Sequence, residues 1–236
     1  MNKKFCLLED IDFFNVNILL RFMQLFSVHA PLGNFSYSHG LELAVSRNWV
    51  CSVAEFIVWQ KELMNSQLVY LDLPILYRFY DCIMCNDIDR FWYYLEQLLS
   101  FRETYELRME EQDRGKVIVQ LMYKLGLSLD SCWELILKKS ILAGIAWMGC
   151  VWKIPVNILC VGYSYSYIEN NVISGLKLLL FGQFVAQQLI MYFLKLLPEI
   201  LRQSVLITDN ELGNSFPFQG ISSSCHEVQD SRLFRS

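Results

Sequence analysis

The chain has 236 residues, of which 54% are hydrophobic and 19% are charged, and its formal net charge is −4 at pH 7. A chain of this length can bury a core without disulfides or metals, and its net negative charge argues against a nucleic-acid-binding surface, which would carry a basic stripe. The apolar excess leaves three interpretations: a large core, a membrane span, or surfaces that bind protein partners.

The first 15 residues are expected to form an N-terminal extension. Lys3 and Lys4 resemble the start of a signal peptide, but Glu9, Asp10 and Asp12 interrupt the apolar run that an export signal requires. The protein is therefore expected to be cytoplasmic. Its eight cysteines are then expected to be reduced thiols that pack as small hydrophobes, because the cytosol disfavours disulfides.

Apolar residues recur with the helical period over most of residues 16–202, which we expect to form one domain. The helical segments cover residues 18–26, 41–49, 53–64, 87–122, 129–152 and 156–201. Pro31 and Gly33 predict a loop at residues 29–34. Few segments alternate with the period of two that a half-buried strand shows. The sequence predicts an all-α fold, a single-domain irregular helical bundle with a flexible C-terminal tail.

Charged residues within the segment 87–122 are spaced for pairing along a helix. Arg102 and Glu106 are four residues apart, as are Glu110 and Arg114, and this spacing favours ion pairs on a helix surface. The adjacent acids Glu110 and Glu111 are more typical of a solvated helix face than of an acid/base pair.

The composition changes at about residue 203, where serine, asparagine, glycine and proline become frequent. Residues 203–236 hold too few apolar side chains to bury themselves, so they are interpreted as a C-terminal tail. Two interpretations stay open from composition. The tail is a frayed terminus, or it orders on a partner through the apolar residues Val228, Leu233 and Phe234, with Arg232 and Arg235 as flanking basic residues.

The alternative interpretation is a membrane-associated or integral helical protein that uses the apolar stretch 178–194. A membrane span needs about 20 mostly apolar residues. This stretch contains Gln183, Gln187 and Gln188, and each amide would need a partner at membrane depth. The sequence therefore favours a protein without a membrane span.

The sequence holds little that indicates catalysis, and we expect no enzymatic activity. It has three histidines, no nucleophile in a recognisable elbow and no glycine-rich phosphate loop. Cys82 and Cys85 have the spacing of a metal-binding pair, but they lack a second pair and are more typical of burial. Cys225 and His226 are the better candidates for transient metal contact, because thiolate and imidazole suit nickel or zinc. No tightly bound cofactor is expected.

Four stretches in chain order carry a resemblance to the urease accessory protein F family (UreF). They are Pro31-Leu-Gly-Asn-Phe-Ser-Tyr-Ser-His-Gly-Leu-Glu42; Arg102-Glu-Thr-x-Glu-Leu-Arg to Gly115; Ala146-Trp through Ile154-Pro, Glu169-Asn and Lys177-Leu to Gly182-Gln and Gln187; and His226-Glu-Val-Gln-Asp-Ser-Arg-Leu-Phe-Arg-Ser236. The sequence departs from the family pattern at Asn34, His39, and the pair Ser224 and Cys225 before His226.

The resemblance implies an all-α, non-enzymatic urease maturation factor that forms homodimers. It implies a complex with the accessory protein UreD/UreH, recruitment of the nickel-carrying GTPase UreG, and docking on the apo-urease subunits. In that complex the protein would act as a scaffold for nickel insertion and influence the GTPase, with nickel as a cargo in transit.

The first and last of the four stretches are expected to supply the partner-binding residues. These are Pro31, Gly33, Phe35, Tyr37, Ser38, Glu42, His226, Glu227, Ser231, Arg232, Leu233, Phe234 and Arg235. The aromatic residues of the first stretch have the composition of an interface anchor, although packing of the first helices against each other would require the same residues. The resemblance favours the tail as a segment that orders on a partner.

Overall fold

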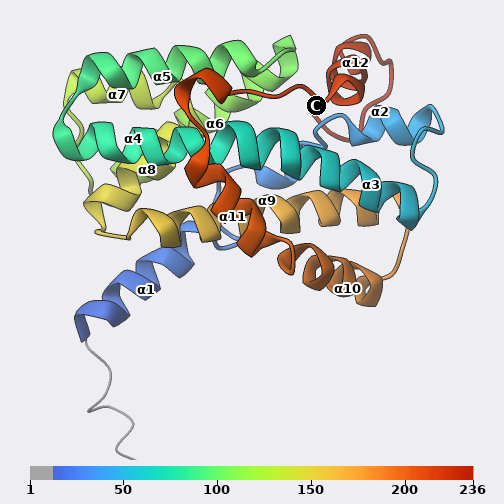
Figure 1. The fold of residues 1–236 in the computed structure, drawn as a ribbon, viewed down its shortest axis with the longest axis horizontal. Helices are drawn as coiled ribbons and strands as arrows, with labels where there is room; N and C mark the ends of the chain where they lie inside the picture. Colours follow the sequence, from blue (N-terminus) through green and yellow to red (C-terminus); the bar gives the residue numbers. More distant parts are fainter. Residues whose placement is uncertain (1–12, 236) are drawn as a thin grey trace, which may run out of the picture.

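The computed structural model describes residues 13–235, and over this range the chain forms helices joined by short loops, with no strand (Figure 1). The elements are α1 (Phe13–Leu25), η1 (Asn34–Ser36), α2 (Leu41–Ser46), α3 (Val53–Leu63), η2 (Met64–Asp72), α4 (Leu73–Cys85), α5 (Ile88–Phe101), α6 (Tyr105–Lys124), α7 (Ser131–Leu137), α8 (Ile141–Val151), α9 (Val156–Leu179), α10 (Gln183–Leu194), α11 (Leu197–Leu206), η3 (Asp209–Glu211) and α12 (Pro217–His226). The predicted all-α fold is confirmed. The predicted N-terminal extension lies almost entirely outside the described residues.

Local sequence signals explain where several helices begin. A side-chain oxygen at the N-cap accepts a hydrogen bond from a backbone N–H of the first turn, which satisfies a donor that the helix itself leaves unpaired. Residues that cap in this way are Ser52 for α3, Asp87 for α5, Thr104 for α6, Asp130 for α7 and Ser140 for α8.

The centre of the molecule is a nearly continuous helical rod formed by α3, the π-helix η2 and α4 (Figure 1). It packs against α5 and α8, while α8 also contacts α6, and α9 contacts α10. Large aromatic side chains, among them Phe56, Phe79 and Phe91, are fully buried in this core. The rod and α6 carry the polar side chains described below.

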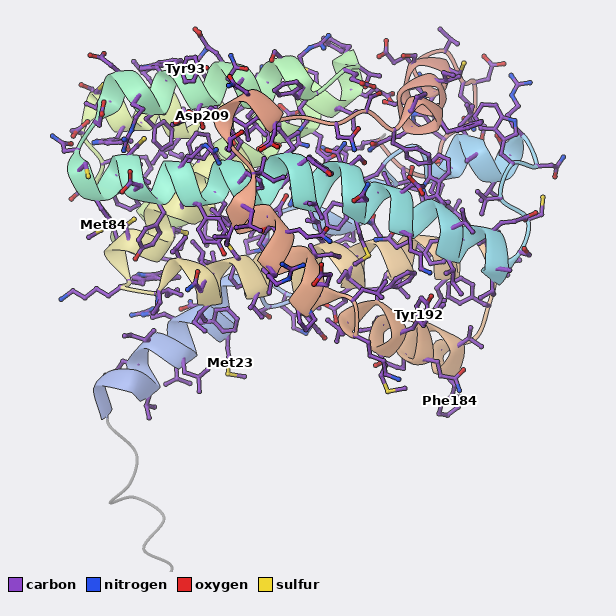
Figure 2. All side chains as sticks on the ribbon, in the orientation of Figure 1. Met23, Met84, Tyr93, Phe184, Tyr192 and Asp209 are labelled. Atoms are coloured by element: carbon purple, nitrogen blue, oxygen red, sulfur yellow. The ribbon has the colours of Figure 1, made fainter. Side chains whose placement is uncertain are left out.

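A proline inside the rod creates an attachment point for the chain that follows α11. Pro74 has no N–H to donate to the preceding turn, and the carbonyl of Tyr70 instead accepts a 2.8 Å hydrogen bond from the N–H of Gly213. Nearby, the carboxylate of Asp209 (Figure 2) accepts hydrogen bonds from Arg78 Nε at 2.7 Å and from the Tyr94 hydroxyl at 3.0 Å. These contacts fix the residues between α11 and α12 across α4 and α5.

The helical segment predicted at residues 87–122 is interrupted at residues 102–104, between α5 and α6. The predicted ion pair between Arg102 and Glu106 is therefore wrong, because Arg102 turns into the core and pairs with Asp72 and Glu111. The pair between Glu110 and Arg114, within α6, is confirmed at 2.8 Å.

The C-terminal residues also differ from the flexible tail that their composition suggests. They form α12, which packs against α2 and α6, and a final stretch that returns to residues 36–42. Gln219, Ser222, Ser223 and His226 are polar and nevertheless buried. Polar residues can be buried when their hydrogen bonds are made elsewhere in the fold, and here their partners lie on distant elements.

Within residues 13–235 no single helix is long and apolar enough to cross a membrane, although α10 and α11 together would suffice by length and composition, with a 40° bend between them. The apolar stretch 178–194 is broken, because α9 ends at Leu179 and α10 begins at Gln183. Part of the apolar excess is on the surface, where Met23 on α1 and Phe184 on α10 point into solvent (Figure 2).

Candidate partner-docking site

Three of the four sequence motifs meet in space around the N-terminal half of α6. The loop of residues 31–42, the junction between α5 and α6, and the C-terminal residues 226–235 all make contacts there. The junction supplies Arg102, and α6 supplies three acids, Glu106, Glu110 and Glu111, all of them buried. The acids hold three sets of contacts, which we describe from the inside outward.

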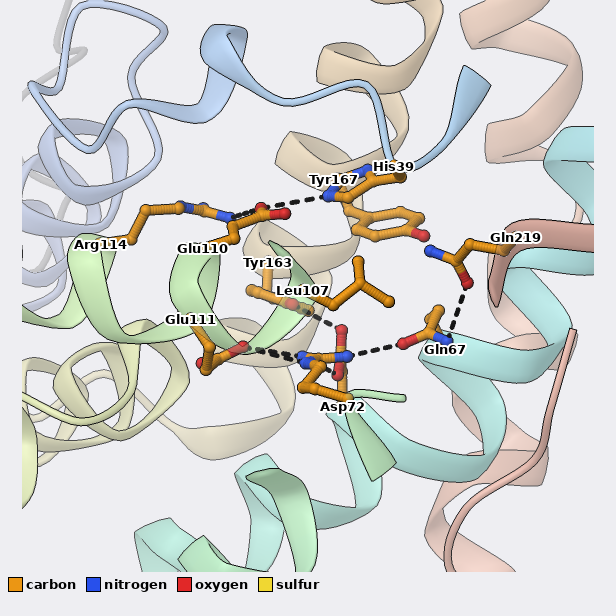
Figure 3. A pocket seen from close by; sticks show the side chains of 11 residues that line it. His39, Gln67, Asp72, Leu107, Glu110, Glu111, Arg114, Tyr163, Tyr167 and Gln219 are labelled. Carbon is orange, nitrogen blue, oxygen red and sulfur yellow. Dashed lines mark hydrogen bonds and ion pairs between the residues drawn. The ribbon is translucent and has the colours of Figure 1, made fainter. Parts of the chain in front are cut away.

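The inner cluster consists of Arg102 with Asp72, Glu111, Gln67 and Tyr163, and Figure 3 labels the last four of these. Arg102 donates to Asp72 Oδ1 at 2.7 Å, to Glu111 Oε2 at 2.9 Å and to Gln67 Oε1 at 2.6 Å. The Tyr163 hydroxyl donates to the second oxygen of Asp72 at 2.6 Å. Burial alone would lower the pKa of Arg102, but the carboxylates of Asp72 and Glu111 hold this pKa well above its usual value. The guanidinium is therefore a permanent positive charge that joins η2 to α6.

The second cluster is centred on His39, which stacks on Tyr167 with ring centroids 5.4 Å apart (Figure 3). His39 Nδ1 lies 2.7 Å from Asn171 Oδ1, and Nε2 lies 3.2 Å from Glu110 Oε1. Burial alone would lower the pKa of His39, but the Glu110 carboxylate outweighs it and the pKa is raised. Burial alone would raise the pKa of Glu110, but His39 and Arg114 lower it to about 2. The pair therefore ties the 31–42 loop to α6 through opposite charges.

The cavity enclosed by these two clusters has a volume of only about 30 Å³. A cavity of this size accommodates little more than one water molecule. The buried charges therefore satisfy each other rather than surround a space for a substrate, and their role in this arrangement is to fix the elements that carry them.

The third set, which we call the tail anchor, consists of Glu42, Glu106, His226 and Arg232. Glu42 accepts hydrogen bonds from the backbone N–H groups of Leu233 and Phe234, at 2.6 and 2.8 Å. His226 Nδ1 lies 2.9 Å from Glu106 Oε2, and its Nε2 lies 3.4 Å from Glu42 Oε2 without forming a hydrogen bond.

Arg232 adds an ion pair to Glu106 at 3.2 Å and reaches the carbonyl of Glu227 at 2.5 Å. Burial raises the pKa of Glu106, whereas His226 and Arg232 act to lower it. Two carboxylates from α2 and α6 thus face an imidazole and a guanidinium from the C-terminal residues, with Phe234 buried beside them.

Backbone geometry brings the loop and α12 close enough for these contacts. Gly40 has φ +83°, a left-handed conformation that glycine adopts without steric cost. A Cβ at this position would lie 3.1 Å from Cβ of Ser222, whose hydroxyl donates to the carbonyl of Gly40. Thr104 and Ser223 join their hydroxyls at 2.7 Å, and the N–H of Arg235 donates to the carbonyl of Ser36 at 2.8 Å.

Comparison with known proteins identifies the family to which this arrangement belongs. The sequence model of the UreF family matches residues 50–193. The urease accessory protein UreF of Blochmanniella floridana is 44% identical over 218 residues, which cover 92% of this chain and 96% of that protein. The UreF proteins of Pseudomonas entomophila and Citrobacter koseri are 43% and 38% identical, and each match covers 92% of this chain and 97% of the relative. The chain belongs to the UreF family.

Membership of the UreF family gives the predicted docking residues a context, and the structure divides them into an inward and an outward group. The buried group consists of Tyr37, Ser38, Glu42, His226 and Phe234. The exposed group consists of Pro31, Phe35, Ser231, Arg232, Leu233 and Arg235, with Gly33 and Glu227 half-buried. The inward group joins the loop to the tail, and the outward group lies at the surface, although Arg232 also pairs with Glu106 in the tail anchor.

Sequence reasoning missed most of the inner cluster in this UreF chain. The interpretation of Glu110 and Glu111 as a solvated helix face is wrong, because both are buried. Asp72, Gln67 and Tyr163 were not singled out at all. One signal could have located the cluster: Arg102 lies two residues before Thr104, a helix-capping residue, so it is outside α6 and could not share a helix face with Glu106.

The cysteines considered as metal ligands differ in their exposure to solvent. Cys82 is buried and accepts a hydrogen bond from Arg90 Nε at 3.2 Å, whereas Cys85 is exposed. Cys225 is exposed while its neighbour His226 is fully buried between two carboxylates. Across residues 13–235 no three His, Cys, Asp or Glu side chains converge in a way that could hold a metal ion.

Proposed function

We propose that this chain is a non-catalytic assembly factor of urease maturation. Its relatives are named urease accessory proteins, and they match it over nearly their full length. The observation that carries the proposal is that the tail anchor brings two distant motifs to one face of the molecule. Phe35 and Leu233, 54% and 66% exposed, lie on segments joined by the hydrogen bond between Arg235 and Ser36.

This face has the composition of a protein interface. An aromatic and an aliphatic side chain are exposed close to two arginines, Arg232 and Arg235, and aromatic residues and arginine are enriched in interfaces. The face is proposed to bind the accessory protein UreD/UreH. The resulting complex contains a homodimer of this chain, recruits the GTPase UreG and docks on apo-urease in the cytoplasm. Nickel is then cargo of the complex, and the scaffold modulates the GTPase.

Co-purification tests this function. The tagged chain is co-expressed with UreD/UreH, UreG and the urease subunits, and we expect the wild type to retain UreD/UreH and to support urease activation. The double variant Phe35→Asp with Leu233→Asp should lose both properties, while Met84→Asp, a change at an equally exposed position on α4, should keep them. A wild-type chain that retains none of these proteins, although all are soluble, would overturn the proposal.

The tail is proposed to take part in docking rather than to be a passive terminus. Removal of residues 222–236 should abolish urease activation while circular dichroism shows nearly unchanged helical content, because most helices lie before this point. A truncated chain that activates urease normally would contradict a docking role for the tail.

Direct nickel binding through Cys225 and His226 stays a prediction, and the geometry weighs against it because both ring nitrogens of His226 face carboxylates. Equilibrium dialysis of the wild type against Cys225→Ser and His226→Ala decides the matter. Cys225→Ser is the cleaner variant, since this thiol is exposed and the substitution leaves the tail anchor intact. Lower nickel uptake by both variants would establish the site.

A further inference from the structure

A separate groove is lined by residues of α3, of the segment after α2 and of the start of α12, elements that lie close together in Figure 1, and its lining contains none of the predicted docking residues. Its volume is about 520 Å³, and it opens to solvent. Its lining is formed by Trp49, Val50, Glu55, Val58, Trp59, Glu62, Phe216, Pro217 and Phe218. We call it the acidic groove, because the charged side chains in this lining are both carboxylates.

The floor and walls of the acidic groove are aromatic. Trp59 and Phe216 meet edge to face with ring centroids 4.9 Å apart, and Trp49 and Phe218 do so at 6.0 Å. Phe218 is 58% exposed and Val58 is 61% exposed. Contiguous apolar surface of this kind marks binding sites on soluble proteins, and tryptophan is among the residues that most often anchor an interface.

The two carboxylates lie seven residues apart on α3, which places them about 10 Å apart along one face of the helix. Glu55 uses one oxygen to accept hydrogen bonds from the Cys51 N–H at 2.7 Å and the Ser52 hydroxyl at 3.0 Å. These bonds lower the pKa of Glu55, so it is charged. The neighbouring cation Lys61 lies over the ring of Tyr192, 5.3 Å from its centroid, on the side of α10.

The carboxylates beside the exposed ring of Trp49 determine which side chains can bind in the groove. A lysine or arginine gains an ion pair with a carboxylate and also an attraction to the face of an aromatic ring. A second copy of this chain is a poor occupant, because a two-fold contact would bring the same acidic surface against itself. An acidic segment would meet the same repulsion.

We propose that the acidic groove receives an amphipathic segment of another protein of the urease assembly. A large apolar side chain of that segment packs against Trp49, Val58 and Phe218, and an adjacent lysine or arginine pairs with Glu55 or Glu62. This inference rests on the proposed assembly function and assigns it a second, chemically distinct docking surface. Since α12 forms one wall, the groove exists only while the tail is folded onto the domain.

The test is retention of co-expressed UreD/UreH, UreG and urease subunits by the tagged full-length chain. Val58→Asp on α3 is compared with Val205→Asp on α11, which changes a valine of similar exposure, 61% against 58%, on another helix. Val58→Asp should reduce retention of one partner by about tenfold or more, because it places an unpaired carboxylate among aromatic rings. Val205→Asp should retain every partner at the wild-type level.

A second pair of variants tests charge and does not depend on the first. Glu62→Lys should weaken retention of the same partner, and Glu96→Lys, at an exposed position on α5, should not. Higher ionic strength should also weaken wild-type retention of that partner, because salt screens exposed ion pairs. If circular dichroism shows that Val58→Asp is unfolded, this pair decides the question.

The outcomes separate this inference from the function on which it rests. A wild-type chain that retains no partner overturns the assembly function itself. Full retention by folded Val58→Asp and by Glu62→Lys overturns only the acidic groove as a docking surface. A decrease in the mass of the isolated chain, measured by light scattering, on Val58→Asp substitution would show that the occupant is a second copy, and would also overturn the proposal.

Discussion

The carboxylate of Glu42 is the clearest single point at which the tail can be released from the domain. It lies in the first turn of α2 and accepts hydrogen bonds from the N–H groups of Leu233 and Phe234, at 2.6 and 2.8 Å. The Glu42→Ala substitution removes both acceptors at once. The inner cluster around Arg102 contains no atom of Glu42, so the helical core should be preserved.

The size of the effect follows from the two hydrogen bonds. Bonds to a charged group contribute about 1.5–3 kcal/mol each, and the lower value is appropriate because Leu233 is largely exposed. Loss of both therefore weakens the attachment of residues 232–235 by about 3 kcal/mol. Since about 1.4 kcal/mol corresponds to a factor of ten, local opening should become about 100-fold more frequent.

Hydrogen exchange measured residue by residue tests this result. The amides of Leu233 and Phe234 should exchange about 100-fold faster in Glu42→Ala than in the wild type. Amides in the buried part of α8 should be unaffected. Glu42→Gln, which keeps one acceptor oxygen, should fall between the two, and Glu62→Ala, at an exposed site, should match the wild type. Equal exchange of Leu233 in wild type and Glu42→Ala would refute this account of the tail anchor.

Three further substitutions test the buried clusters and the helix packing. His39→Gln should remove a pH dependence of stability. Because the pKa of His39 is raised in the folded state, its pairing with Glu110 stabilises the wild type fully below pH 6.5 and less as the pH rises through the folded-state pKa. Between about pH 6 and about pH 9 the urea midpoint should therefore fall more for the wild type than for the variant. Gly115→Ala should lower the free energy of unfolding, measured by thermal unfolding, by about 1–3 kcal/mol, because the added Cβ would lie 2.7 Å from the backbone N of Ser140. Gly182→Ala, whose Cβ would meet nothing within 4 Å, should change the same free energy by less than about 0.5 kcal/mol. Arg102→Ala should lower the free energy of unfolding in urea by about 3–5 kcal/mol, since it leaves buried carboxylates without their cation, and a variant as stable as the wild type would show that the inner cluster is dispensable.

The helical content of this protein could be predicted because it depends on local signals. Apolar periodicity located most helices, and capping residues such as Ser52 and Asp87 begin helices where the pattern starts. The break at residues 102–104 escaped prediction. The cap at Thr104 is a local signal for this break, but the contact that holds Arg102 outside the helix is non-local: its guanidinium reaches Asp72 on η2, 30 positions earlier in the chain.

The same distinction explains what could be predicted of the candidate site. The motif of residues 31–42 and the C-terminal residues were both identified as interaction elements, but their contact with each other was not. Glu42 and Leu233 are 191 positions apart, and nothing in the local composition pairs them. Composition alone made the tail look incapable of burial, because most of its buried residues are polar; Ser222 and His226, for example, obtain their partners from α2 and its N-cap and from α6. Long-range pairing of polar groups thus decides the site and leaves little trace in the periodicity of the chain.

The tail anchor and the acidic groove share α12, and this sharing has a thermodynamic consequence. His226, at the C-terminal end of α12, belongs to the tail anchor, while Phe218, at its N-terminal end, lines the acidic groove. When the tail is detached, part of the binding free energy of a partner that fills the groove is used to fold α12 back onto the domain. The coupling free energy is reciprocal: a bound partner stabilises the attached tail by the same amount by which the attached tail stabilises partner binding. Glu42→Ala should therefore weaken retention of the groove partner although Glu42 lies outside the groove, and excess partner should slow the exchange of the Leu233 amide. Retention by Glu42→Ala equal to that of the wild type, with the tail shown by exchange to be detached, would mean that the tail anchor and the groove act independently.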